Sequence, residues 1–272
     1  MAKYLRILLV VAVLGWLALS SQSSVEAARY RAGAPRLEAA RYRAGARRAA
    51  QQRRREPPKG PTPRLADGKP DLSGVWNGGG PIEDITVGLP KGETIPILPE
   101  AQKIMAARQS KDDPEANCLP TGIPRIAPYP WRIIQTPTHI FFLFEGNIHS
   151  YRQIFMSVSK HPDDLDPTWY GHSIGHWEGD TLVVDTIGFN DKFWFDFVGH
   201  PHTEKLHTIE RYTRKDLGTL VNEVTIDDPG AYSKPFTVTF TARLLPGEEL
   251  MEYICQENEQ DTKHIQGPAR KP

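Results

Sequence analysis

The chain has 272 residues, with 33 Lys and Arg against 33 Asp and Glu, so its formal net charge is zero. This balance hides an asymmetry, because residues 1–64 carry 14 basic and 3 acidic side chains while the remainder carries 19 basic and 30 acidic ones. The sequence contains neither a glycine-rich phosphate-binding loop nor a Cys-x-x-Cys pair, and thus offers no motif for nucleotide binding or dithiol redox chemistry.

The N-terminus has the order of features found in a secretory signal peptide. Lys3 and Arg6 form a basic segment, residues 7–19 are apolar, and Val25 and Ala27 occupy the −3 and −1 positions of a small-residue cleavage site. The apolar run 7–19 is shorter than the stretch of about 20 apolar residues that a bilayer span needs. The sequence therefore predicts a signal peptide at 1–27, no transmembrane anchor, and an exported protein that is periplasmic or secreted.

Residues 28–64 form a basic Arg/Ala-rich arm. The nonapeptide Glu-Ala-Ala-Arg-Tyr-Arg-Ala-Gly-Ala occurs at 26–34 and again at 38–46. With few large apolar residues the arm cannot bury a core, and we expect it to be disordered. Basic arms often bind nucleic acid, but an exported chain meets little of it. An anionic polymer of the cell envelope, or the protein's own acidic domain, is the expected contact; a solvated tether is the alternative.

Residues 65–272 are long enough for a single domain with a sizeable core. The one good helix pattern runs over 99–109, with proline in its first turn, and 77–98 and 112–130 are rich in Gly and Pro. Strand patterns occupy 72–76, 131–135, 140–145, 150–156, a central hairpin at 172–187, and then 206–214, 219–226, 236–244 and 251–255. In 236–244 apolar side chains alternate with Thr and Arg.

This spacing of short strands indicates an all-β, antiparallel barrel or sandwich with one short helix and long excursions. The apolar run 140–144 reads as buried on both sides and has no edge protection, which favours the barrel. Cys118 and Cys255, in an oxidising compartment, predict one disulfide; two buried free thiols are the alternative.

The hairpin brings histidines towards carboxylates. If Glu178 and Gly179 are its loop residues, His172 faces Asp185, a pair able to hold a tautomer or to move a proton. A loop one residue longer would separate the pair and leave a rim histidine. The Ser173 environment, Gly-His-Ser-Ile-Gly, is no hydrolase elbow, because that motif needs a strand, a sharp turn and a helix.

Acid–base chemistry would use a histidine with a nearby carboxylate. The candidate catalytic residues are His172, His202, His207, Asp185 and Glu145, and we expect the three histidines to form a functional rim at the barrel mouth. On the strand 206–214, His207 and Glu210 face opposite sides, so Glu210 is expected to pair with an arginine instead.

A metal is a weaker alternative. His200, His202 and His207 have ligand chemistry suited to zinc, iron or copper. However, the carboxylate that follows them does not have the cupin spacing, and Pro201 interrupts the strand. We therefore expect no cofactor.

Aromatic residues supply the candidate ligand contacts. The segment 193–197 is unusually apolar for a link between strands, and such loops often cover a barrel mouth; a cluster packed beneath the loop is the alternative. The predicted ligand-binding residues are Trp169, Tyr170, Phe193, Trp194 and Phe195.

Two resemblances follow from these residues. Gly74-Val75-Trp76 is similar to the Gly-x-Trp of lipocalins and their calycin relatives. In those barrels the tryptophan plugs the closed end and a late arginine covers it, a position that the resemblance implies for Arg211, Arg214 or Arg243.

Residues 65–261 also resemble an uncharacterised family of exported bacterial proteins, for which no activity is established. The matching stretches are 67–76 (Asp-Gly-Lys-Pro-Asp-Leu-Ser-Gly-Val-Trp), 118–120, 167–190 (with Gly-His-Ser-Ile-Gly and Trp-Glu-Gly-Asp-Thr-Leu-Val-Val-Asp-Thr), 201–202, 206–207, 210–211 and 252–255. The basic arm lies outside this resemblance, and His176 stands where the family pattern has a larger cation.

The sequence thus favours an exported barrel that binds a small apolar or aromatic molecule. One alternative is a cofactor-free acid–base enzyme, an isomerase, lyase or cyclase, with histidines at the barrel mouth. The other is a structural envelope protein held by its basic arm.

Overall fold

The computed structural model describes residues 56–126, 129–146 and 150–255. The predicted signal peptide and most of the predicted arm lie outside these residues. The folded unit begins at Pro57. No helix within the described ranges combines the length and the apolar character that a membrane span requires.

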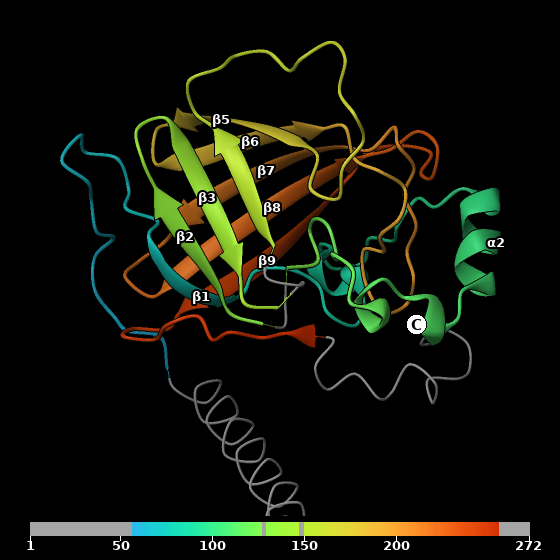
Figure 1. Cartoon of the computed structure of the whole chain (residues 1–272), viewed down its shortest axis with the longest axis horizontal. Helices are drawn as coiled ribbons and strands as arrows, with labels where there is room; N and C mark the ends of the chain where they lie inside the picture. Colours follow the sequence, from blue (N-terminus) through green and yellow to red (C-terminus); the bar gives the residue numbers. More distant parts are fainter. Residues whose placement is uncertain (1–55, 127–128, 147–149, 256–272) are drawn as a thin grey trace, which may run out of the picture. The chain divides into compact units, whose positions relative to one another are not determined.

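The described residues form nine strands that close into a barrel, each strand pairing with the next and the last with the first (Figure 1). The predicted barrel is confirmed. Its strands are β1 Gly74–Gly78, β2 Trp131–Gln135, β3 His139–Phe144, β4 Tyr151–Phe155, β5 His172–Glu178, β6 Thr181–Ile187, β7 His207–Arg214, β8 Thr219–Asp227 and β9 Phe236–Leu244. Between β1 and β2 lie the helix α2, Pro99–Ala107, and the 3-10 turns η1 Ile85–Gly88, η2 Ser110–Asp112 and η3 Glu115–Asn117.

The barrel is mixed, not wholly antiparallel as the sequence suggested. Strands β4 and β5 run parallel, with Ile154 opposite Ser173 and Phe155 opposite Ile174, while every other neighbouring pair is antiparallel. A closed ring with an odd number of strands must contain at least one parallel pair. The loop from β4 to β5 is long enough for the crossover that a parallel pair needs, about a dozen residues or more.

Side chains alternate between the barrel interior and its outer surface. In β9, Phe236, Val238 and Phe240 are buried and the threonines between them are more exposed, as the sequence pattern predicted. The same alternation holds in β3, where Phe141 and Leu143 are only partly buried. The expectation that this strand is buried on both sides is therefore wrong, because in a single-walled barrel one face of each strand points outward.

One end of the barrel is closed by Trp76 and Arg214. The Trp76 indole is fully buried and donates from Nε1 to the Leu72 carbonyl at 2.9 Å. The Arg214 guanidinium lies 4.9 Å from the centre of this indole ring and donates to the carbonyls of Asp71 and Leu217. Of the three arginines considered from the sequence, Arg214 covers the tryptophan.

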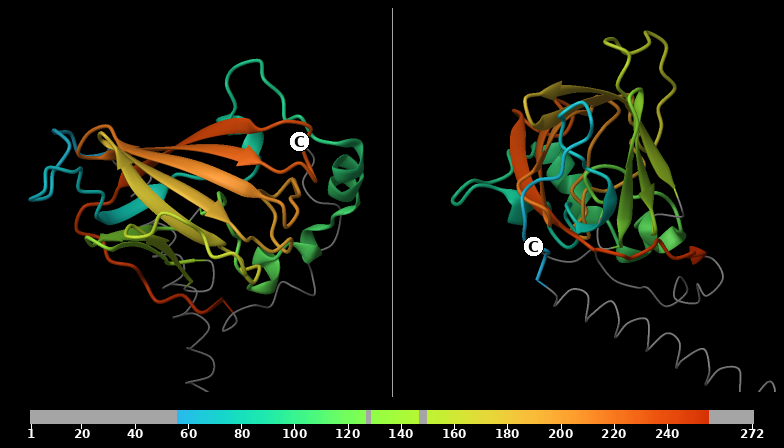
Figure 2. Two further views of the ribbon diagram at one scale, coloured as in Figure 1. Left: turned by 90° about the horizontal axis from the view of Figure 1, so that it is seen from above. Right: turned by 90° about the vertical axis from the view of Figure 1, so that its left-hand side faces the viewer.

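Residues that the sequence assigned to the basic arm contact this closed end. Thr62 donates from Oγ1 to the Arg214 carbonyl at 2.9 Å, and the Leu217 N–H donates to the Gly60 carbonyl at 2.9 Å. The two views of Figure 2 place the segment 57–72 at one end of the barrel and α2 towards the opposite end. The long excursion between β1 and β2 therefore covers the end that Trp76 does not close.

The predicted disulfide is confirmed: Cys118 and Cys255 are bonded, with their Cα atoms 5.7 Å apart. The strand predicted at 251–255 does not form. Since β9 already pairs with β1, the barrel offers no free edge to a further strand. The segment is held instead by the disulfide and by the Met251 N–H, which donates to Glu145 Oε2 at 2.9 Å.

Candidate functional site

The register of the central hairpin differs from the predicted one. Its two loop residues are Gly179 and Asp180, so that Glu178 faces Thr181, and Gly179 adopts a positive φ of 59° at the first loop position, as a type II′ turn requires. His172 therefore faces Ile187, not Asp185. The direct cross-strand pair is wrong by two residues. Because a shift of two preserves the faces, His172 and Asp185 still share one side of the sheet.

His161, in the loop between β4 and β5, bridges these two side chains. Its Nδ1 atom lies 2.8 Å from His172 Nδ1, and its Nε2 atom lies 3.1 Å from Asp185 Oδ1. His172 in turn stacks on Phe155 of β4, with ring centres 4.9 Å apart. Sequence reasoning missed His161, because a histidine in a polar loop has no periodic pattern to signal where its ring lies.

His207, at the start of β7, completes the group. Its Nε2 atom lies 2.9 Å from the same Asp185 Oδ1 atom. We call His161, His172, Asp185 and His207 the histidine cluster. The structure thus brings together three of the residues that the sequence selected and adds a fourth from the loop.

The hydrogen bonds of the histidine cluster define its proton positions when every ring is neutral. Ionised Asp185 can only accept, so His161 and His207 each donate from Nε2. His161 must then accept at Nδ1, and His172 donates from its own Nδ1. Burial and the neighbouring His161 ring lower the pKa of His172, which favours its neutral form. Of the three unprotonated ring nitrogens, His161 Nδ1 accepts from His172, whereas His172 Nε2 and His207 Nδ1 accept no bond within the cluster.

The cluster lies on the outer surface of the barrel. Ser173 and Thr186, which neighbour His172 and Asp185 in sequence, are fully buried and face the interior. The side chains of Asp185 and His207 are 35% and 36% exposed to solvent. Solvent and solutes can therefore reach these groups without entering the barrel.

The other two predicted catalytic residues lie elsewhere. Glu145 follows β3, is buried, and accepts the Met251 N–H described above. His202 is buried too, with its ring centre 3.8 Å from that of Phe193 and 5.2 Å from that of Phe195. Burial lowers the pKa of His202 to about 4. It is therefore a core histidine and not part of a rim, because its loop folds inward over the end of the barrel.

The aromatic segment 193–195 packs into this end of the barrel. Phe193 and Phe195 are fully buried, and Trp194 lies against Arg108, whose guanidinium is 4.6 Å from the indole centre. Burial lowers the pKa of Arg108 to about 10. The rings of this segment therefore pack into the protein, which was the alternative to a loop that lines a ligand site.

The remaining two predicted ligand contacts, Tyr170 and Trp169, also pack with the core. Tyr170 stacks on Phe144, with ring centres 5.4 Å apart, and its hydroxyl lies 2.5 Å from Ser150 Oγ. Trp169 is partly buried against the core.

The barrel interior contains a buried ion pair between Arg152 of β4 and Glu210 of β7. Arg152 also donates from Nε to Ser173 Oγ at 3.0 Å and from Nη2 to Thr186 Oγ1 at 2.8 Å, and the Tyr212 hydroxyl donates to Glu210 Oε1 at 2.6 Å. The prediction that Glu210 faces away from His207 and pairs with an arginine is confirmed. Burial acts to lower the pKa of Arg152, but Glu210 and Tyr212 together outweigh burial and raise that pKa.

Three polar atoms of this interior have no hydrogen-bond partner among the described residues: Arg152 Nη1, Thr208 Oγ1 and Asn222 Oδ1. Thr208 lies beside Glu210 on β7 and opposite Thr186. Asn222 on β8 donates from Nδ2 to the Tyr212 hydroxyl at 3.3 Å, which leaves its oxygen free. A buried polar atom without a partner costs about 1–3 kcal/mol, and native proteins contain few.

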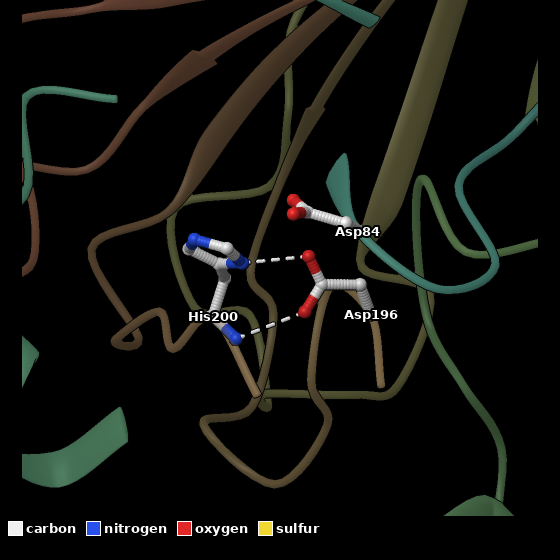
Figure 3. A group of neighbouring side chains, drawn as sticks. All are labelled: Asp84, Asp196 and His200. Atoms are coloured by element: carbon white, nitrogen blue, oxygen red, sulfur yellow. Dashed lines mark hydrogen bonds and ion pairs between the residues drawn. The ribbon is translucent and has the colours of Figure 1, made fainter. Parts of the chain in front are cut away.

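A third group, Asp84, Asp196 and His200, has ligand atoms close enough together to suit a metal ion (Figure 3). However, Asp196 already accepts from the His200 ring and from three backbone N–H groups, of Ile85, Gly199 and His200. Asp84 likewise accepts the Thr86 N–H at 2.8 Å. These bonds join η1 to the loop after β6, which is a structural role.

The structure does not assemble the metal trio considered from the sequence. His200 bonds to Asp196, His202 lies between phenylalanine rings, and His207 belongs to the histidine cluster. The chain was also compared with protein-family models, with curated proteins and with solved structures, and none matched. The sites of the structure are therefore the basis for assigning a function.

Proposed function

We propose that this protein is an exported barrel that binds a small, uncharged aromatic molecule in its interior. The observation that carries the proposal is the set of three buried polar atoms, on Arg152, Thr208 and Asn222, that have no hydrogen-bond partner within the described part of the chain. Ligand sites typically combine apolar walls with a few well-placed polar groups. A ligand that bonds to these atoms would remove a cost that the protein otherwise bears.

The chemistry of the interior suggests the ligand class. Arg152 Nη1 needs an acceptor, Asn222 Oδ1 needs a donor, and the Thr208 hydroxyl can serve as either. Since Arg152 is already neutralised by Glu210, a charged ligand would be buried without a counter-ion, which is unfavourable. An uncharged molecule bearing a carbonyl or hydroxyl group fits these requirements.

The surrounding rings favour an aromatic body. Phe142 lies 5.8 Å from the Arg152 guanidinium, and its ring centre is 5.0 Å from that of Trp131 and 5.3 Å from that of Tyr212. Aromatic pairs at such spacings are favourable in offset and edge arrangements. The ligand would therefore meet polar groups and aromatic faces within one interior.

The closed end supports a lipocalin-like or calycin-like barrel as the finer description of the fold. Trp76 under Arg214 reproduces the arrangement that the Gly-x-Trp resemblance implies. Barrels of about eight strands can hold one small ligand. The disulfide between Cys118 and Cys255 is compatible with export, because such bonds persist in oxidising compartments.

Binding can be tested with 6-propionyl-2-(dimethylamino)naphthalene, an uncharged aromatic ketone whose fluorescence shifts to the blue in an apolar site. We expect saturable binding at one equivalent. Thr208→Val removes one interior hydroxyl at nearly constant volume and should weaken binding about 2- to 10-fold, the value of one hydrogen bond.

Thr239→Val is the matched control, because it makes the same change on the exposed outer face of β9 and should leave the affinity unchanged. Thermal unfolding of both variants checks that the barrel is intact. If no saturable blue shift occurs, or if Thr208→Val binds as tightly as the Thr239→Val control, the interior site is refuted. A filled interior would then favour the structural alternative.

A further inference from the structure

We propose that the histidine cluster is a site for one divalent transition-metal ion of the zinc class, with His161, Asp185 and His207 as ligands. This site is separate from the proposed interior one and does not depend on it. It uses the outer surface of the barrel, where the loop after β4 meets β6 and β7.

The geometry converges on a single oxygen. The Nε2 atoms of His161 and His207 lie 3.1 and 2.9 Å from Asp185 Oδ1. Two ligands bound at about 2.0–2.1 Å and at right to tetrahedral angles lie about 2.9–3.4 Å apart, so each nitrogen already has ligand spacing from Oδ1. The three ligand atoms do not all lie within 4.8 Å of one another, so the two rings must move closer together for an ion to contact all three. Two rings that needed only an acceptor could have used both carboxylate oxygens. An ion beside Oδ1 would draw the two nitrogens together around it.

The donor set indicates the class of ion. Imidazole nitrogens suit zinc, copper, iron and nickel, whereas calcium and magnesium prefer oxygen ligands. Three protein ligands also leave at least one coordination position open, as in catalytic zinc sites. The bound ion would thus remain accessible to water or to a substrate.

His172 has the position of an outer-shell partner. A metal-bound histidine usually gives the proton on its second ring nitrogen to a neighbouring acceptor, which orients the ring. With Nε2 on the ion, His161 would carry its proton on Nδ1 and donate it to His172 Nδ1, 2.8 Å away. His172 is itself held by stacking on Phe155, so the orienting group is rigid.

The surrounding charge favours a cation. Asp185 supplies one negative charge within the cluster, and Asp227 is the direct cross-strand partner of His207. Lys160, which precedes His161, pairs with Asp163 at 2.7 Å. Asp185 and His207 are placed by two adjacent, paired strands, so only the loop that carries His161 needs to adjust.

Metal binding is tested by isothermal titration of Zn²⁺ into tag-free, metal-stripped protein, with Co²⁺ absorption as a second readout. We expect one equivalent of Zn²⁺ to bind and visible Co²⁺ bands of a four- or five-coordinate site. His161→Gln, His207→Gln and Asp185→Asn should each weaken Zn²⁺ binding more than about 100-fold. His172→Phe should weaken it about 10- to 100-fold, the usual effect of removing an outer-shell partner.

Two controls separate this site from other residues. His176→Gln changes an exposed histidine further along β5 that contacts Glu178, and Asp84→Asn changes the group of Figure 3. Both should bind Zn²⁺ like the wild type. Circular dichroism without metal checks that every variant is folded.

The proposal is overturned if folded wild-type protein takes up no Zn²⁺ or Co²⁺. It is equally overturned if His176→Gln or Asp84→Asn abolishes binding while His161→Gln and His207→Gln do not. Either result favours the hydrogen-bonded chain of neutral rings over a metal site at this surface.

Discussion

Replacing Glu210 by leucine would leave the Arg152 guanidinium in the barrel interior without a counter-ion. Both side chains are almost completely buried, with 1% of Arg152 and none of Glu210 exposed. Breaking a buried pair by removing one partner costs about 3–5 kcal/mol, because the remaining charge is uncompensated. With a urea dependence of about 2 kcal/mol per molar, the unfolding midpoint should fall by about 1.5–2.5 M.

A second replacement, Arg152→Met, should restore most of this loss, because it removes the stranded charge. Ser173 Oγ and Thr186 Oγ1 remain hydrogen-bonded to each other at 3.0 Å. The Tyr212 hydroxyl loses its acceptor on Glu210, which costs about 1–3 kcal/mol. Adding Tyr212→Phe should recover that remainder.

The measurement is urea unfolding followed by tryptophan fluorescence, since Trp76 and Trp131 are fully buried in this barrel. The matched control is Glu178→Gln, which breaks the exposed pair with Arg211, the next residue of β7. Exposed pairs contribute little to stability, so its midpoint should hardly move. If Glu210→Leu is harmless, or if adding Arg152→Met destabilises it further, the account of this interior pair is wrong.

Two further predictions concern Arg214, which covers Trp76 at the closed end of the barrel, and the buried His202. Arg214→Lys should lower Tm by about 4–12 °C, because lysine cannot cover the Trp76 ring and reach the Asp71 and Leu217 carbonyls together; an unchanged melting curve would contradict this. For His202, whose pKa falls from 6.5 to about 4 on folding, the unfolded chain binds the extra proton as pH drops below 6.5. The free energy of unfolding should therefore fall by about 2–3 kcal/mol between pH 7.5 and 4.5. Urea unfolding at both pH values should show that His202→Leu lacks this decrease.

Much of the barrel could be predicted from local patterns. The alternation in 236–244 and 206–214 assigns each side chain to a face, because side chains of a strand point to opposite sides in turn. It correctly placed His207 and Glu210 on opposite faces, and the structure shows that Glu210 is the inner one. The disulfide was also predictable, since the chain has only two cysteines.

The candidate sites were only partly predictable, because they depend on contacts between distant segments. His161 is 24 residues from Asp185, and Arg152 is 58 residues from Glu210. No spacing rule relates such positions. His202 was misplaced for the same reason: a loop histidine next to proline looks exposed, and only the packing of its loop buries it.

By itself, then, the sequence determined most of the strands, the alternation of their side chains, the helix and the disulfide, because period, turn residues and cysteine count are local properties. The tertiary structure alone decided that nine strands close with β4 parallel to β5, that Gly179 sets the hairpin register, and that His161 joins His172 to Asp185. Ring closure, register and loop packing are each set by how the whole chain fits together, which no local pattern specifies.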